Sequence, residues 1–171
     1  MNETRDNETR DIGNPVIEEV ASEPVASAVA VAGHPLHAMS VHFPIAFVIA
    51  TLGCDVFYWW TADPFWLRAG LWAAGLAFVS GVGAGLFGTA ELIIVAGIRK
   101  RVASWTHAVA AMMLISIAGL NWGLRLVDET VVLPHGLMVS VLACIFTALA
   151  GWHGGKLVFD HGIGLLISEK D

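Results

Sequence analysis

Four long apolar stretches dominate this chain and restrict what it can fold into. They cover residues 41–60, 69–90, 102–124 and 131–155, and each is close to the roughly 20 residues that a helix needs to cross a bilayer. Hydrophobic residues make up 56% of the chain and charged residues 14%, which is far from the balance of a soluble domain. The sequence therefore predicts an all-α fold, an integral membrane four-helix bundle.

The ends of the four helices can be placed from local signals. Pro44 suits the first turn of a helix, and aromatic residues on both sides of the turn 61–64 mark a membrane–water interface. A single transmembrane domain is expected over residues 34–165. Its helices are expected at about 41–60, 65–95, 102–126 and 133–155.

The segment before this domain has a different composition. Residues 1–33 hold seven acidic residues and two arginines, so they supply −5 of the net charge of −6. Such a segment is typical of a disordered tail, and its acidic start argues against a signal peptide. Residues 166–171 are predicted to form a short polar tail. Without a basic stripe, the chain shows no sign of nucleic-acid binding.

Basic residues predict the orientation in the membrane. Arg99, Lys100 and Arg101 lie between the second and third helices, whereas the other surface has only Arg68 and Arg125. The tribasic loop should therefore be cytoplasmic. With four crossings, both termini lie on that same side.

Histidines gather at this predicted cytoplasmic end. Each helix places one ionisable or ligating group there, namely His42, Glu91, His107 and His153, and His34, His37 and His161 lie in flanking segments on the same side. His135 alone lies at the other end. An ionisable group within a membrane segment marks a functional site by default.

Imidazole is the commonest metal ligand, so two kinds of site are open. His42, His107, His153 and His161 are candidate ligands of a haem b, since histidines on facing helices can hold its iron from both sides. Alternatively, His42, Glu91, His107 and His153 suit a first-row metal ion, with His34 and His37 as peripheral candidates. The alternative is a structural role, in which these histidines hydrogen-bond helix ends and no cofactor is bound.

Other polar and small residues have mainly structural interpretations. Asp55 is expected to pair with Arg125 or Arg68, and Asn121 to hydrogen-bond across helices. Gly81 and Gly85 share a helix face, which favours close helix packing, although glycines also make room for a flat cofactor. No catalytic residue is assigned, because the chain has no nucleophile motif or zinc-protease motif.

Two histidine signatures resemble a known family. His34-Pro-Leu-His37 with Val41-His-Phe-Pro44, and Gly151-Trp-His-Gly-Gly155 with Asp160-His-Gly162, are similar to bacterial membrane proteins catalogued as domain of unknown function 2231. The resemblance covers His34 to about Leu165 and implies a compact four-helix membrane protein, sometimes found beside redox partners. It implies that His34, His37, His42, His107, His153 and His161 are characteristic positions. Glu91 stands where relatives are associated with aspartate.

The layout resembles four-helix b-type cytochromes less closely. Together these features predict a protein of the bacterial inner membrane that binds one haem b or metal ion and serves electron transfer with a redox partner protein. It is not expected to be an enzyme. The alternative is a non-redox membrane component, for proton or solute handling or as a scaffold.

Overall fold

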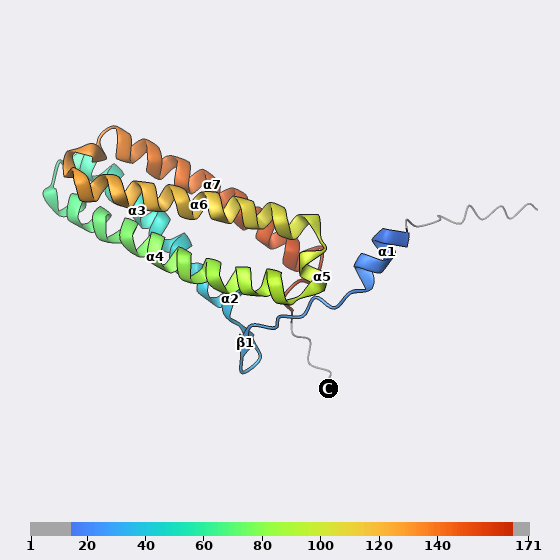
Figure 1. Cartoon of the computed structure of the whole chain (residues 1–171). Helices are drawn as coiled ribbons and strands as arrows, with labels where there is room; N and C mark the ends of the chain where they lie inside the picture. The colour runs from blue at the N-terminus through green and yellow to red at the C-terminus, as the bar shows by residue number, and fades with distance from the viewer. Residues whose placement is uncertain (1–14, 166–171) are drawn as a thin grey trace, which may run out of the picture.

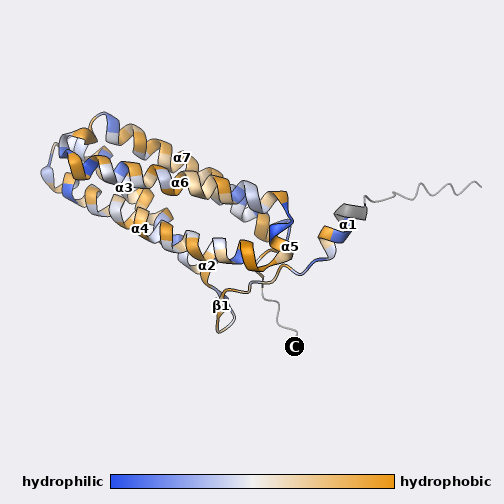
Figure 2. Ribbon diagram, viewed as in Figure 1, coloured by the Kyte–Doolittle hydropathy of each residue, from blue (hydrophilic) through white to orange (hydrophobic). Residues whose placement is uncertain are grey.

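The computed structural model describes residues 15–165 and consists mainly of four long helices that lie side by side (Figure 1). These are α3 (His42–Thr61), α4 (Pro64–Ile94), α6 (Val102–Val127) and α7 (His135–Phe159). Each is long and apolar enough to cross a membrane, and orange residues run along all four in Figure 2. The predicted all-α four-helix membrane fold is confirmed.

Short elements connect and extend the bundle. Helix α1 (Pro15–Ser22) precedes a hairpin of β1 (Ala30–Val31) and β2 (His34–Pro35), and α2 (Leu36–Ser40) leads into α3. Helix α5 (Ala96–Arg99) and the 3-10 helix η1 (Glu129–Val132) complete the order.

The predicted helix ends lie within about a turn of the observed ones. Helix α4 begins at Pro64, because the Asp63 side chain caps it by accepting a hydrogen bond from the Phe65 N–H at 2.8 Å. Helix α7 differs most, since it continues past Gly155 to Phe159. It ends where Gly162 adopts a φ of +62°. The Gly162 and Ile163 N–H groups then bond back to the carbonyls of Val158 and Leu157, a helix end for which glycine is suited.

The segment expected to be disordered differs from the structure over residues 15–33. Helix α1 and the β1–β2 hairpin lie in or beside it, and the hairpin turns at Ala32 and Gly33, which both have positive φ. Contacts with distant parts of the chain, among them Glu91 and Lys100, order this segment. Residues 1–14 and the tail 166–171 lie outside the described residues.

Small residues fill the interior of the bundle. Its buried apolar positions are mostly alanines, which include Ala74, Ala77, Ala118 and Ala143. A Cβ on Gly81 or Gly85 would meet the Ile115 side chain at 3.4 or 3.0 Å, so these two glycines allow helices α4 and α6 to approach closely. Large apolar side chains face outward, as a lipid environment requires.

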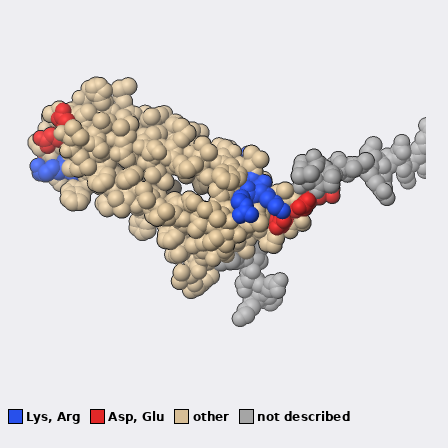
Figure 3. Space-filling model, in the orientation of Figure 1, with Lys and Arg blue, Asp and Glu red and all other residues tan. Residues whose placement is uncertain are grey.

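Charged side chains gather at the two ends of the bundle (Figure 3). We call the end with Arg99, Lys100 and Arg101 the basic end. The opposite end contains the α3–α4 turn and η1, with Asp63, Arg68 and Glu129. The surface between the two ends shows neither Lys and Arg nor Asp and Glu in this view.

Candidate functional site

Two histidines from different helices meet at the basic end. His37 lies on α2, and its Nδ1 donates to the Ala84 carbonyl of α4 at 2.9 Å. Its ring lies directly over Gly88, where a Cβ would come within 2.8 Å of the ring atoms. The absence of a side chain at position 88 therefore creates the space for this imidazole.

His107 is held in the same way by another helix. From α6, its Nδ1 donates to the Ala150 carbonyl of α7 at 3.1 Å, and its ring packs on Gly154. The centroids of the His37 and His107 rings are 6.1 Å apart, with 77° between their planes. We call these two residues the histidine pair.

The hydrogen bonds define what each imidazole offers. A carbonyl oxygen can only accept, so each Nδ1 carries the proton. In the neutral ring, Nε2 then has a free lone pair. Metal-bound histidines are commonly oriented by such a bond from the other ring nitrogen to a main-chain carbonyl.

Ser104 lies one turn before His107 on the same face of α6. Its residue is 3% exposed, and among the described residues its hydroxyl is the buried side-chain polar group without a hydrogen-bond partner. A buried hydroxyl in this condition costs stability. It therefore leaves an unused donor and acceptor one turn from His107.

The remaining histidines are not assembled with the pair into a larger cluster. His42 is exposed and bonds to the Met39 carbonyl of its own chain segment at 3.1 Å. His34 and His161 are also exposed, and His153 is half-buried beside Gly154. His135 starts α7 at the opposite end. Within residues 15–165, no three His, Cys, Asp or Glu side chains come together to hold a metal ion.

Glu91 has a different role from the predicted one of metal ligand. Its carboxylate accepts hydrogen bonds from the Ser27 hydroxyl, from the Ala28 N–H at 3.1 Å and from the Val29 N–H at 3.0 Å. Both oxygens are used. The set of His42, Glu91, His107 and His153 therefore does not form a common site in the structure.

The segment that Glu91 holds, residues 23–29, is here called the strap. Glu23 forms a salt bridge of 2.5 Å with Lys100, and the hydrogen bond and charge of Glu23 raise the pKa of Lys100 above its ordinary value. The Pro24 carbonyl lies so close to Gly97 that any Cβ there would overlap it. Val25 accepts from the Gly164 N–H at 2.9 Å. The strap thus ties α4, α5 and the turn that follows α7 together.

A second polar group lies deep in the other half of the bundle. Arg125 forms a bidentate pair with Asp55, at 2.8 and 2.7 Å, and its Nε donates to Asn121 at 2.8 Å. Ser140 donates to Asp55 at 2.6 Å and accepts from Asn121 at 2.8 Å. We call these four residues the buried network. The predicted Asp55–Arg125 pair and the predicted cross-helix role of Asn121 are confirmed, while Arg68 stays exposed.

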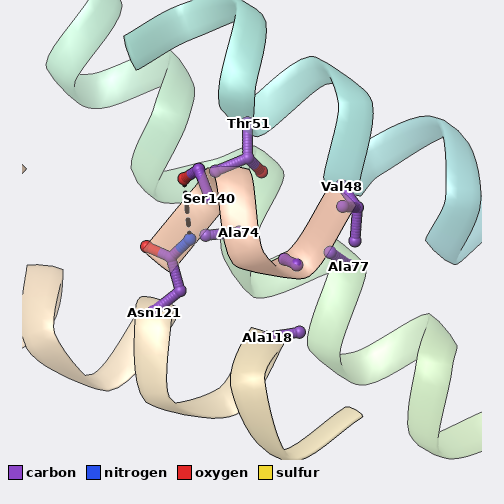
Figure 4. Close-up of a pocket in the computed structure, with 8 residues that line it drawn as sticks. Val48, Thr51, Ala74, Ala77, Ala118, Asn121 and Ser140 are labelled. Atoms are coloured by element: carbon purple, nitrogen blue, oxygen red, sulfur yellow. Dashed lines mark hydrogen bonds between the residues drawn. The ribbon is translucent and has the colours of Figure 1, made fainter. Parts of the chain in front are cut away.

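A small cavity adjoins the buried network at the centre of the bundle (Figure 4). Thr51, Asn121 and Ser140 line it together with Val48 and alanines of three helices, and most of its wall is apolar. Its volume of about 10 Å³ is near the minimum that admits one water molecule. A second cavity, of about 30 Å³, lies toward the opposite end and is lined by Arg68, Arg125 and Glu129.

The structure makes prominent two residues that the sequence does not single out. The sequence predicts His37 only as a peripheral candidate, because the turn that carries α2 back against α4 cannot be read from local patterns. Ser104 has one sequence signal, its spacing of three residues from His107, which places both on one helix face.

Comparison with known families agrees with this fold. Residues 33–166 match the sequence model of a family described as "Predicted membrane protein (DUF2231)". The chain belongs to this family. The DUF2231 match covers the four long helices and the histidine pair but leaves the strap outside. No curated protein and no solved structure matches the chain. The weaker likeness to b-type cytochromes stays a prediction.

Proposed function

We propose that this protein binds one first-row transition-metal ion through His37 and His107 and serves electron transfer in the membrane. The observation that carries the proposal is the pair of imidazoles. Each is fixed through Nδ1 to a main-chain carbonyl, and the ring centroids are 6.1 Å apart. Four elements, α2, α4, α6 and α7, contribute to this arrangement.

The separation of the rings supports a shared ion. A metal–nitrogen bond of about 2.0–2.1 Å puts an imidazole centroid roughly 3 Å from the metal. Two imidazoles that held one ion would therefore have centroids within about 6 Å of each other, and the His37 and His107 centroids are 6.1 Å apart. His153, which precedes Gly154 on α7, is a further candidate ligand, and Ser104 would hydrogen-bond a water molecule or anion on an open coordination position.

A single ion fits these residues better than a haem. The space left by Gly88 and Gly154 is filled by the rings of His37 and His107 themselves, and Gly81 and Gly85 face Ile115. A macrocycle needs free room on all sides of the axis between two ligands. Haem b therefore becomes the alternative cofactor in our proposal, and it would require the helices to separate.

The setting supports an electron-transfer role more than catalysis. The pair lies at one end of a membrane bundle, where a redox partner protein could approach, and iron or copper bound there would exchange one electron without substrate chemistry. We propose the bacterial inner membrane as the location and the cytoplasm as the side of the basic end, because Arg99, Lys100 and Arg101 lie there.

A non-redox role is the second candidate. Each imidazole already bonds a helix carbonyl, so the pair would also serve to hold α2, α4, α6 and α7 in place without a metal. In that case the histidines are structural and the protein acts as a scaffold or in proton handling. The buried network would support proton handling only within its own part of the bundle. The cavity beside it has room for about one water molecule and is too small for a solute.

Metal analysis and a visible spectrum of the same detergent-purified sample test the proposal. We expect one iron or copper ion per chain, lost in His37→Ala and in His107→Ala but retained in the control His34→Ala, which alters an exposed histidine. A sharp b-type band in the reduced-minus-oxidised spectrum would show that the cofactor is haem and not a single metal ion. A metal-free and haem-free protein from supplemented cells would favour the structural candidate.

A further inference from the structure

We infer that Glu91 is a positioning residue for His37 and acts through the strap. The inference rests on the proposed function in that His37 is taken as a ligand. It starts from one face of α4. Ala84 and Gly88 contact the His37 ring, and Glu91 follows one turn later with its carboxylate on residues 27–29. The same helix face therefore fixes both the ring and the strap that leads to it.

The chain between Glu91's partners and His37 is short and closed. The Leu36 N–H donates back to the Val29 carbonyl at 3.0 Å, so the β1–β2 hairpin forms a closed loop on Val29. Val29 itself donates to Glu91. His37 follows directly after Leu36. A shift of the strap would consequently move α2 and with it the His37 ring.

The chemistry of the contact requires a carboxylate. Glu91 is 8% exposed, and its three partners are two main-chain N–H groups and one hydroxyl. An ionised carboxylate only accepts, which matches these donors. The amide of a glutamine would turn an NH₂ group toward one of them and lose that bond. The change Glu91→Gln therefore removes the fit while keeping size and shape nearly constant.

The first experiment needs no metal. We compare metal-free full-length protein and its Glu91→Gln variant by the rate at which diethyl pyrocarbonate modifies each histidine, read by mass spectrometry. We expect modification of His37 to become several-fold faster, while His135 at the opposite end keeps its rate. The control Glu129→Gln changes an exposed carboxylate at that opposite end and should leave both rates unchanged.

The second experiment measures affinity with Co²⁺ as a visible probe. Positioning partners of ligands typically contribute about 10- to 100-fold in affinity, so Glu91→Gln should bind Co²⁺ more weakly by that factor with an unchanged absorption band shape. An altered band shape with an unchanged His37 rate would instead make Glu91 a ligand and overturn the inference. Unchanged rate and affinity would also overturn it.

The role of Glu91 can be decided even if the protein binds no metal or if the Glu91→Gln variant does not fold. If the wild-type protein binds no metal, the proposed function fails, but the His37 modification rate still decides the role of Glu91. If Glu91→Gln does not fold, Ser27→Ala removes one of the three hydrogen bonds and should give a smaller acceleration at His37. No acceleration in a folded Ser27→Ala variant would count against the inference.

Discussion

Arg125 is the most fully satisfied charge inside the bundle. Its guanidinium donates to Asp55, Asn121 and Ser140, and Gly70 leaves the room that its Nη1 needs, since a Cβ there would come within 2.9 Å. A charge buried in a membrane helix is costly unless paired in this way. The four residues therefore act as one unit, and removing any one of them leaves others without a partner.

Replacing Asp55 by Asn should destabilise the protein strongly, because it leaves the Arg125 charge buried and uncompensated. Breaking a buried pair from one side costs about 3–5 kcal/mol. The free energy of unfolding in mixed micelles should fall by this order. The double change Asp55→Asn with Arg125→Gln should recover at least half of the loss. An exposed control, Asp63→Asn, should change little, since Asn also caps a helix well.

Gly88 provides a residue-level test of the histidine site. In Gly88→Ala the new Cβ would lie 2.8 Å from the His37 ring, so the ring must leave its place over α4. We expect loss of the proposed metal binding with little loss of stability, since alanine favours a helix by about 1 kcal/mol over glycine. Gly83→Ala is the matched control on the same helix, because its Cβ meets nothing within 4 Å. Equal metal content in both variants would contradict the site.

At the scale of elements, the long helices follow directly from the sequence and the short ones do not. Apolar length predicts α3, α4, α6 and α7, because lipid forces the backbone to satisfy its own hydrogen bonds. The sequence predicts an end of α7 near residue 155, because Gly154 and Gly155 are typical of a helix end, whereas α7 continues to Phe159. Gly154 instead receives the His107 ring, and the helix ends only near Gly162.

The strap and the histidine pair could not be predicted for a related reason. Local composition made residues 1–33 look disordered, but the strap is ordered by partners far along the chain, namely Glu91, Gly97 and Gly164. Likewise, helix direction predicted that histidines gather at one end. It could not predict which ones face each other, because that depends on the rotation of each helix about its axis.

Gly97 tests whether the strap packs on α5 as an element. A Cβ at this position would overlap the Pro24 carbonyl, so Gly97→Ala should push the strap away from α5 and expose it to protease. Limited proteolysis should then cut residues 23–29 several-fold faster than in the wild type. The matched control is Gly155→Ala at the same end, where nothing lies within 4 Å of the new Cβ. Equal cleavage rates would show that the strap tolerates the side chain.

The molecule as a whole is arranged for lipid as its solvent. Alanine and glycine fill the interior and large apolar side chains cover the outside. The charges at the surface lie at the two ends (Figure 3). In lipid, tight backbone contact and polar pairing replace the hydrophobic driving force between helices. The buried network and the histidine pair sit at different depths of this bundle, so they can be altered separately.

The two ends of α6 test the orientation of the whole molecule. Val102 begins this helix at the basic end and Val127 ends it at the opposite end, and their exposed fractions are 80% and 88%. In a background without Cys54 and Cys144, a cysteine at either position leaves the charges that determine orientation unchanged. A maleimide that does not cross the inner membrane should label Val127→Cys in intact cells and Val102→Cys only after lysis, because basic residues stay in the cytoplasm. The reverse pattern would show that the basic end faces away from the cytoplasm. Equal labelling of both cysteines from one side would mean that α6 does not cross the bilayer.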